Sequence, residues 1–111
     1  MHLEIRENEA GVWAPLRLTQ LFQGYQNIIH GGIIATILDE MAVWASFKKG
    51  HKAVTAELNV RIKKPMFAGA EYLATGRIMA VKYKLVKAQA EIKQVDGEII
   101  AWADVKLIKI D

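Results

Sequence analysis

The residues best suited to chemistry in this 111-residue chain lie in one short segment, His30-Gly31-Gly32 followed by Asp39-Glu40. Glycine lacks a side chain, so a substrate group can come close to its backbone amide. Where such amides open a helix, they have no internal partner and lie at the positive end of the helix dipole. They could therefore polarise a carbonyl group and hold an oxyanion. The ordinary alternative, in which the glycines only allow a tight turn into the helix, stays open on this pattern alone.

The two acids follow the glycines at helical spacing. Residues 31 to about 48 are apolar on most sides, which is typical of a buried helix, and Gly50 fits its end. Gly32 and Asp39 are seven residues apart, so they share a face but lie about 10 Å apart along the axis. A base or nucleophile must lie within about 3–3.5 Å of the reacting atom. One helix cannot easily place both groups on one carbonyl, whereas two antiparallel copies can, which predicts an active site made by a dimer.

The acids also have an ordinary interpretation, as salt-bridged or exposed helix carboxylates. Asp39 and Glu40 point about 100° apart around the helix, so only one of them can share a face with Gly32. Other chemistry finds little support. The chain has no Cys, its single serine, Ser46, is not in a nucleophile elbow, and its three histidines lack the spacing of metal ligands. We therefore expect no metal and no bound cofactor.

Charge and hydropathy limit the partners. The net charge of +3 comes from 15 basic and 12 acidic residues that are interspersed, which does not indicate nucleic-acid binding. The charged N-terminus has no signal-peptide core and no apolar run could span a bilayer, so we expect a cytoplasmic protein without a membrane partner. A hydrophobic content of 52% fits either a full core or burial in an oligomer.

The elements that must position the helix are predicted as strands. Residues 2–6 and 12–18 resemble a hairpin, and residues 19–29 fit a loop or a short helical turn. After the helix, alternation from Ala53 to Pro65 predicts a strand with its polar side chains, Thr55 included, on one face. The apolar face of that strand holds Val54, Ala56, Leu58, Val60 and Ile62.

Three further strands are expected at residues 70–82, 84–95 and 98–110, with Asp96-Gly97 as a hairpin turn. Ile108 and Ile110 fall on the opposite face from the other apolar residues of the last strand, which predicts a bulge or a second buried face. The whole is one α+β domain over residues 1–111, a curved antiparallel sheet wrapped around one long central helix. Because the sheet cannot cover every side of the helix, a second protomer is expected.

These residues resemble the hotdog-fold acyl-CoA thioesterases, in particular the phenylacetate-pathway-like group and the related long-chain enzymes. The helix signature of that family is His-Gly-Gly, six residues, then Asp, which stands here as His30-Gly31-Gly32 and Asp39. A second block matches at residues 54–60, running into Lys64-Pro65 and Gly69. The resemblance covers nearly the whole chain and includes the order of elements, so it implies a hotdog fold.

The resemblance also implies roles for individual residues. Gly32 would polarise the thioester carbonyl through its amide, and Asp39 of the partner protomer would act as general base or nucleophile. Thr55 would orient the attacking water, and His30 would shape the helix start. CoA is part of the substrate. Its nucleotide would lie near the end of the strand that begins at Ala53, where the chain carries basic and amide side chains. These side chains are equally well explained as solvated groups at the edge of the sheet. The substrate-binding residues so implied are Gly31, Asn59, Arg61, Lys63 and Lys64.

One position departs from the family pattern, because Gly24 stands where several members carry an Asn six residues before the motif His. The acyl preference is therefore open. The expected function is hydrolysis of acyl-CoA by a homo-oligomer, with a dimer as the catalytic unit and dimer or tetramer left open. The alternatives are a non-catalytic acyl-CoA-binding or sensor module and, with less support, a hydroxyacyl-thioester dehydratase.

Overall fold

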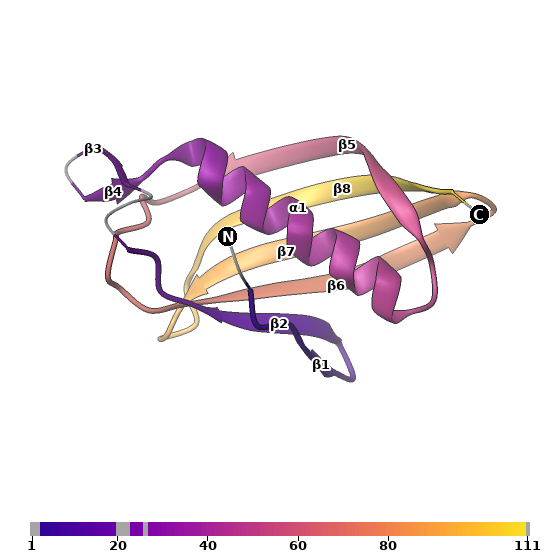
Figure 1. Ribbon diagram of the computed structural model, residues 1–111, viewed down its shortest axis with the longest axis horizontal. Helices are drawn as coiled ribbons and strands as arrows, with labels where there is room; N and C mark the ends of the chain where they lie inside the picture. Colours follow the sequence, from indigo (N-terminus) through magenta and orange to yellow (C-terminus); the bar gives the residue numbers. More distant parts are fainter. Residues whose placement is uncertain (1–2, 20–22, 26, 111) are drawn as a thin grey trace.

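The computed structural model describes residues 3–19, 23–25 and 27–110. Its helix is α1 (Gly31–Lys48), and its strands are β1 (Arg6–Asn8), β2 (Gly11–Leu16), β3 (Gln23–Tyr25), β4 (Ile28–Ile29), β5 (Ala53–Ile62), β6 (Tyr72–Lys82), β7 (Leu85–Gln94) and β8 (Ile99–Lys109). α1 lies across one face of a six-stranded antiparallel sheet in the order β1-β2-β6-β7-β8-β5, and β3 pairs with β4 apart from it (Figure 1). The predicted α+β arrangement is confirmed.

Both ends of α1 are explained by local side-chain and backbone chemistry. The imidazole of His30 accepts a hydrogen bond from the amide of Gly32, which satisfies one of the unpaired amides at the helix start. At the other end Gly50 has φ +87° and its amide donates to the carbonyl of Phe47. Such left-handed residues commonly end helices, because they turn the chain away from the axis. The predicted bounds of residues 31 to 48 are confirmed.

The helix is buried on one face only within the protomer. The side away from the sheet is half-buried at Ile33, Val43 and Trp44, and Phe47 is 51% exposed. Asp39 and Glu40 are both half-buried. The residues of α1 that are fully buried against the sheet are Ile34, Ile37, Leu38, Met41, Ala42, Ala45 and Ser46. The sequence predicted a helix that is buried on nearly all sides. Within the protomer only the face toward the sheet is buried, and the apolar side chains on the other faces are partly exposed to solvent.

Two glycines allow α1 to approach the sheet closely at its middle. A Cβ on Gly76 of β6 would come within 2.5 Å of the carbonyl oxygen of Met41 in α1. On the next strand, a Cβ on Gly11 would come within 2.2 Å of the carbonyl oxygen of Gly76. Real Cβ contacts are never so short, so both positions require glycine. Helix, β6 and the start of β2 are thus in contact through backbone rather than through side chains.

The N-terminal third differs from the sequence prediction. The first strand lies at Arg6–Asn8, not at residues 2–6, because Asn8 makes the turn: its Oδ1 accepts the amides of Ala10 and Gly11, each at 2.9 Å. Residue 2 is outside the described part of the chain. The segment 19–29 holds the short strands β3 and β4 where a loop or helical turn was expected. Residues 20–22 and 26 of that segment also lie outside the described part.

A register shift in β5 reverses the predicted faces at its start. Thr55 pairs with Leu107 of β8 and Glu57 pairs with the next residue, Lys106, so Ala56 is an extra residue in the strand. Leu107 is buried under α1, and directly opposed residues share a face of the sheet. Thr55 therefore faces the helix, and Val54 faces away. The simple alternation predicted from the sequence, with Thr55 on the polar face, is wrong at this point.

The end of β8 keeps its alternation. Leu107 is fully buried, and its neighbour Ile108 is 39% exposed on the face away from α1. Ile110, beyond the strand, is 60% exposed. The prediction of a bulge or of a second buried face is therefore wrong for these two residues, which lie on an open face of the sheet.

Candidate active site

The best-defined polar contact of the predicted site joins α1 to β5. The hydroxyl of Thr55 donates to Oδ1 of Asp39 at 2.5 Å, across 16 residues of sequence. Both residues are half-buried. The register shift at Ala56 turns Thr55 toward the helix, in agreement with the tendency of β-bulges to re-aim side chains beside functional sites. The carboxylate keeps its second oxygen, Oδ2, for another partner, because the threonine hydroxyl occupies only Oδ1.

The start of α1 forms the second part of the predicted site. The Gly32 amide, which the sequence suggested as the oxyanion donor, donates to Nδ1 of His30 at 2.9 Å. A neutral imidazole that accepts at Nδ1 carries its hydrogen on Nε2. Within the described residues, the amide of Gly31 makes no hydrogen bond. The free donor at the helix start is thus Gly31, and the Gly32 amide becomes free only when the His30 ring turns away.

The two parts do not meet within one protomer. Gly32 and Asp39 lie on the same helix two turns apart, about 10 Å along the axis. Both lie on the flank of α1 toward β5, where Thr55 meets Asp39. β5 is the outer strand of the sheet, bonded to β8 on one side only. The candidate site is therefore open at the edge of the protomer.

The predicted substrate-binding residues fall into two groups. Lys63 and Lys64 line a hollow of about 370 Å³ that also contains Gly31 and Ile62. Glu98 forms ion pairs with both lysines, at 2.8 Å to Lys64 and 3.9 Å to Lys63. The structure thus brings these lysines to the helix start.

Asn59 and Arg61 lie elsewhere. They pair with Asp104 and Trp102 of β8, which puts them on the face of the sheet away from α1. The structure separates these two residues from Gly31 and from the hollow at the helix start.

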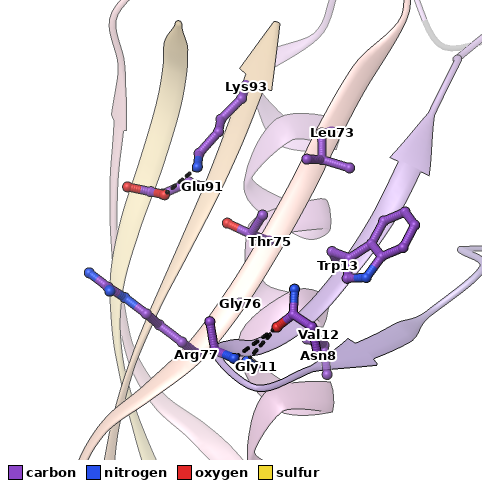
Figure 2. A pocket seen from close by; sticks show the side chains of 11 residues that line it. Asn8, Gly11, Val12, Trp13, Leu73, Thr75, Gly76, Arg77, Glu91 and Lys93 are labelled. Atoms are coloured by element: carbon purple, nitrogen blue, oxygen red, sulfur yellow. Dashed lines mark hydrogen bonds and ion pairs between the residues drawn. The ribbon is translucent and has the colours of Figure 1, made fainter. Parts of the chain in front are cut away.

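A larger hollow of about 510 Å³ lies on the outer face of the sheet, between the β1–β2 hairpin and strands β6 and β7 (Figure 2). Its charged groups have partners: Glu91 pairs with Lys93 at 3.7 Å, and Arg77 donates to Gln89 at 2.8 Å. Of the acids and glycines named from the sequence, none lines it. We therefore do not place the reaction there.

Glu40 is the acid of α1 whose unpaired oxygen is buried. Its Oε2 is shielded from solvent and has no hydrogen-bond partner in the described part of the protein. It points about 100° away from Asp39 around the helix axis, so it does not join the contact with Thr55. Sequence reasoning named this acid but missed two features, the imidazole cap on Gly32 and the register shift at Ala56. A histidine directly before two glycines was the available signal for the cap.

The described ranges also bear on metal binding and membrane insertion. They contain no group of three or more His, Asp and Glu side chains that could hold a metal ion. They also contain no helix with the length and apolarity needed to cross a bilayer.

Comparison with known proteins decides the family. The family model described as "Thioesterase superfamily" matches residues 26–101, which include the helix start, Asp39, Thr55 and most of the sheet. The chain belongs to the thioesterase superfamily.

Individual relatives of this thioesterase-superfamily chain extend the comparison. The acyl-coenzyme A thioesterase THEM4 of Rattus norvegicus is 29% identical over 90 residues, which are 80% of this chain and 39% of that protein. The chain thus spans well under half of that relative's length. The protein BH2602 of Bacillus halodurans, solved with CoA, is 25% identical with a TM-score of 0.85, covering 98% of this chain and 74% of the other.

The fold is also close to that of smu.793 of Streptococcus mutans UA159, solved bound to acetyl CoA. It has a TM-score of 0.91 at 20% identity, covering 99% of this chain and 90% of the other. Agreement at this level over nearly the whole chain confirms the predicted hotdog fold, one central helix against a six-stranded antiparallel sheet.

Proposed function

We propose that this thioesterase-superfamily chain hydrolyses acyl-CoA to free CoA and a carboxylate, with Asp39 as the acid that drives the reaction. The observation that carries the proposal is the 2.5 Å contact between Thr55 and Asp39 at the open edge of the protomer. It supports a carboxylate that is held in one orientation and is not consumed by a salt bridge. The relatives named for acyl-CoA hydrolysis or solved with CoA support the substrate class.

The chemistry requires an attack on the thioester carbon. In one route, Oδ2 of Asp39 takes a proton from water while the water oxygen bonds to the carbonyl carbon. The carbon–sulfur bond then breaks, and the thiolate leaves and takes up a proton to give CoA. In the other route, the carboxylate itself attacks the carbonyl carbon, the carbon–sulfur bond breaks to release the thiolate, and water later cleaves the resulting anhydride. Both routes use the same residue, and Thr55 fixes the carboxylate in either one.

The negative charge that develops on the carbonyl oxygen needs donors. The free Gly31 amide at the positive end of α1 fits this role, and the Gly32 amide adds a second donor when His30 turns away. Lys63 and Lys64, which line the hollow at the helix start, fit the CoA phosphates. To bind them, the lysines would exchange their ion pairs with Glu98 for contacts with the phosphates. Asn59 and Arg61 are left out of this arrangement, because they face the other side of the sheet.

A second protomer would bring the two parts together. An edge strand presents unpaired backbone groups, and β5 also exposes Leu58 (37%) and Ile62 (47%) on its helix side. Pairing β5 with its copy about a two-fold axis would bury these side chains and set the two α1 helices antiparallel. Asp39 of one protomer would then lie beside Gly31 of the partner subunit. This dimer is the catalytic unit we propose.

The test is thiol release from a panel of short, long and aryl acyl-CoAs. The chain has no Cys, so a thiol reagent gives no background from the protein. We expect Asp39→Asn to lower kcat by about 10²–10⁴-fold with unchanged circular dichroism and assembly, because it removes the base but keeps the shape. Glu57→Gln makes the same change in an acid on the outer face of β5 and should keep wild-type activity.

Other outcomes would contradict this assignment. Near wild-type activity of Asp39→Asn combined with a large loss in Glu40→Gln would move the role to Glu40. Binding of acyl-CoA without any release of thiol would favour the non-catalytic binding module. Hydration or dehydration of a hydroxyacyl thioester without hydrolysis would favour the dehydratase.

A further inference from the structure

The far end of the sheet carries an apolar row that the proposed reaction does not use. Strand register places Lys82, Leu85, Ile108 and Val54 side by side across β6, β7, β8 and β5. The next row toward the helix faces α1 and is buried at Val86 and Leu107, so this row faces away from α1. Val54 is 51% exposed and Ile108 is 39% exposed. An open apolar strip formed by Leu85, Ile108 and Val54 therefore crosses β7, β8 and β5 at this end, with Lys82 beside it on β6.

Lysines surround the strip. The neighbouring outward row is Ala80, Lys87, Lys106 and Glu57, in which Lys87 and Lys106 are directly opposed. Like charges in opposed positions destabilise a sheet. Glu57 offsets one of them, through a contact of 3.8 Å with Lys106 in which both side chains are largely exposed. The opposed pair of Lys87 and Lys106 therefore destabilises the protomer, and this is consistent with a surface whose positive charges bind an external partner.

More basic and apolar groups reach the same end through the chain turns. The amide of Lys109 donates to the carbonyl of Lys84, and the amide of Ile110 donates to the carbonyl of Lys52. Ile110 is 60% exposed, and Tyr83 in the β6–β7 turn is 88% exposed with φ +58°. Figure 1 shows that this turn and the last described residues project past the C-terminal end of α1. The lysine-rich end is thus defined by five exposed lysines, Lys52, Lys82, Lys84, Lys87 and Lys106.

We propose that the lysine-rich end is a peripheral docking surface for a bilayer that contains anionic lipids. Lysines near such a surface are attracted to the headgroup phosphates, while their long stems let apolar neighbours approach the acyl region. Val54, Ile108 and Ile110 would enter the interface, and Tyr83 would lie at headgroup level, where a ring with a polar tip is stable. Peripheral contact of this kind needs no membrane-spanning segment. The sequence-based expectation of no membrane partner considered spanning segments only, so it does not address such contact.

Charge complementarity selects this occupant over a second copy of the chain. Two such ends packed face to face would oppose lysine to lysine around the apolar strip, and like-charge contacts disfavour association. An acidic protein is the remaining alternative. The protruding shape of the end and its exposed tyrosine and isoleucines favour a lipid interface, into which such side chains can be inserted without a preformed pocket.

The test is flotation of the full chain with vesicles of phosphatidylcholine alone and of phosphatidylcholine with about 30% phosphatidylserine. We expect binding to the second vesicle only, with release by salt. The double variant Lys87→Gln/Lys106→Gln should lower the partition coefficient at least about tenfold, since about two surface charges are lost. It should still fold, because it removes the opposed lysines. Arg77→Gln/Lys93→Gln removes two cations elsewhere on the same outer face and should bind like wild type.

The apolar part has its own arm, in which Ile108→Ser/Ile110→Ser should weaken binding while the charge is unchanged. Thiol release from acyl-CoA in solution should stay at wild-type level in both double variants, so failure here is distinct from failure of the proposed hydrolysis. Equal binding to both vesicles, or equal loss in the control variant, would overturn the proposal. Salt-sensitive binding to an acidic peptide without any vesicle binding would also overturn it, in favour of an acidic protein partner.

Discussion

A single inserted residue, Ala56, sets the contact between Thr55 and Asp39. Without the extra residue Ala56, Thr55 would face away from α1 and Asp39 would have no hydroxyl partner. A hydrogen bond to a charged group contributes about 1.5–3 kcal/mol, which is far more than a neutral one. The same bond restricts which oxygen of the carboxylate is free to act.

Replacement of the hydroxyl tests this arrangement. Thr55→Val keeps the shape of the side chain but removes the donor to Asp39, and we expect kcat/KM for acyl-CoA to fall roughly 10–100-fold. Thr55→Ser should recover most of the loss, which a purely structural role of the threonine would not explain. Thr75→Val, a half-buried threonine on the outer face, is the matched control. Unchanged kcat/KM in Thr55→Val would remove Thr55 from the mechanism.

His30 adds a second point at the scale of single residues. Its imidazole caps the helix by accepting a hydrogen bond from the Gly32 amide. This amide therefore cannot cap the helix and donate to a substrate oxyanion at the same time. A Cβ on Gly32 would come within 3.1 Å of Nδ1 of His30, whereas a Cβ on Gly31 meets only Ile62 at 3.5 Å. The space around the helix start therefore favours approach to Gly31.

At the scale of elements, α1 and the sheet fit together through glycine. The Gly76 backbone touches that of Met41, so any side chain at this position would push β6 and α1 apart. Overpacking of a close contact typically costs about 1–3 kcal/mol. The central helix is therefore held at a distance from the sheet that no larger residue would allow.

Gly76→Ala should lower the free energy of unfolding by about 1–3 kcal/mol, measured by urea denaturation at constant m-value. Gly31→Ala is the matched control for stability, since its Cβ would make an ordinary contact and its backbone needs no glycine. If the denaturation midpoint of Gly76→Ala equals that of wild type, the backbone contact between β6 and α1 is not a limiting feature of the fold.

Elements with strong local signals were predictable from the sequence. α1 was located to the residue, because a glycine pair begins it and Gly50 ends it. The hairpin between β7 and β8 followed from Asp96-Gly97. The face of Thr55 was not predictable, because a one-residue bulge is set by pairing with β8 and leaves no local pattern. The exposure of Ile108 and Ile110 was also missed, because an apolar residue on the outer face of a strand has the same local pattern whether that face is covered or open.

At the scale of the whole molecule, the proposed site requires two chains. Asp39 and Gly31 lie on the same helix about two turns apart, so they cannot reach one carbonyl within a protomer. The sequence was sufficient to predict the separation of the two groups along α1, because helix rise and spacing are fixed by backbone geometry. It was not sufficient to place Asn59 and Arg61, because only the register of β5 shows that both residues face away from α1.

Subunit mixing tests the shared site directly. Asp39→Asn and Gly31→Val should each be inactive, because one lacks the acid and the other blocks the amide. Co-expression of the two should restore about a quarter of wild-type activity, since half of the dimers are mixed and each holds one intact site. A site contained in one protomer would give no recovery. The mixture can be checked by two affinity tags that isolate the heterodimer.

The edge position of β5 has a consequence for local opening. Native proteins open in segments, and strands bonded on one side only exchange their amide hydrogens faster than central strands such as β7. Thr55 lies on this edge strand, so in an isolated protomer the partner of Asp39 would be among the first groups lost to a transient opening. Pairing of β5 with a second copy would protect those amides. Assembly would therefore do more than bring two half-sites together: it would also suppress the local opening that takes Asp39, the proposed catalytic carboxylate, out of contact with Thr55.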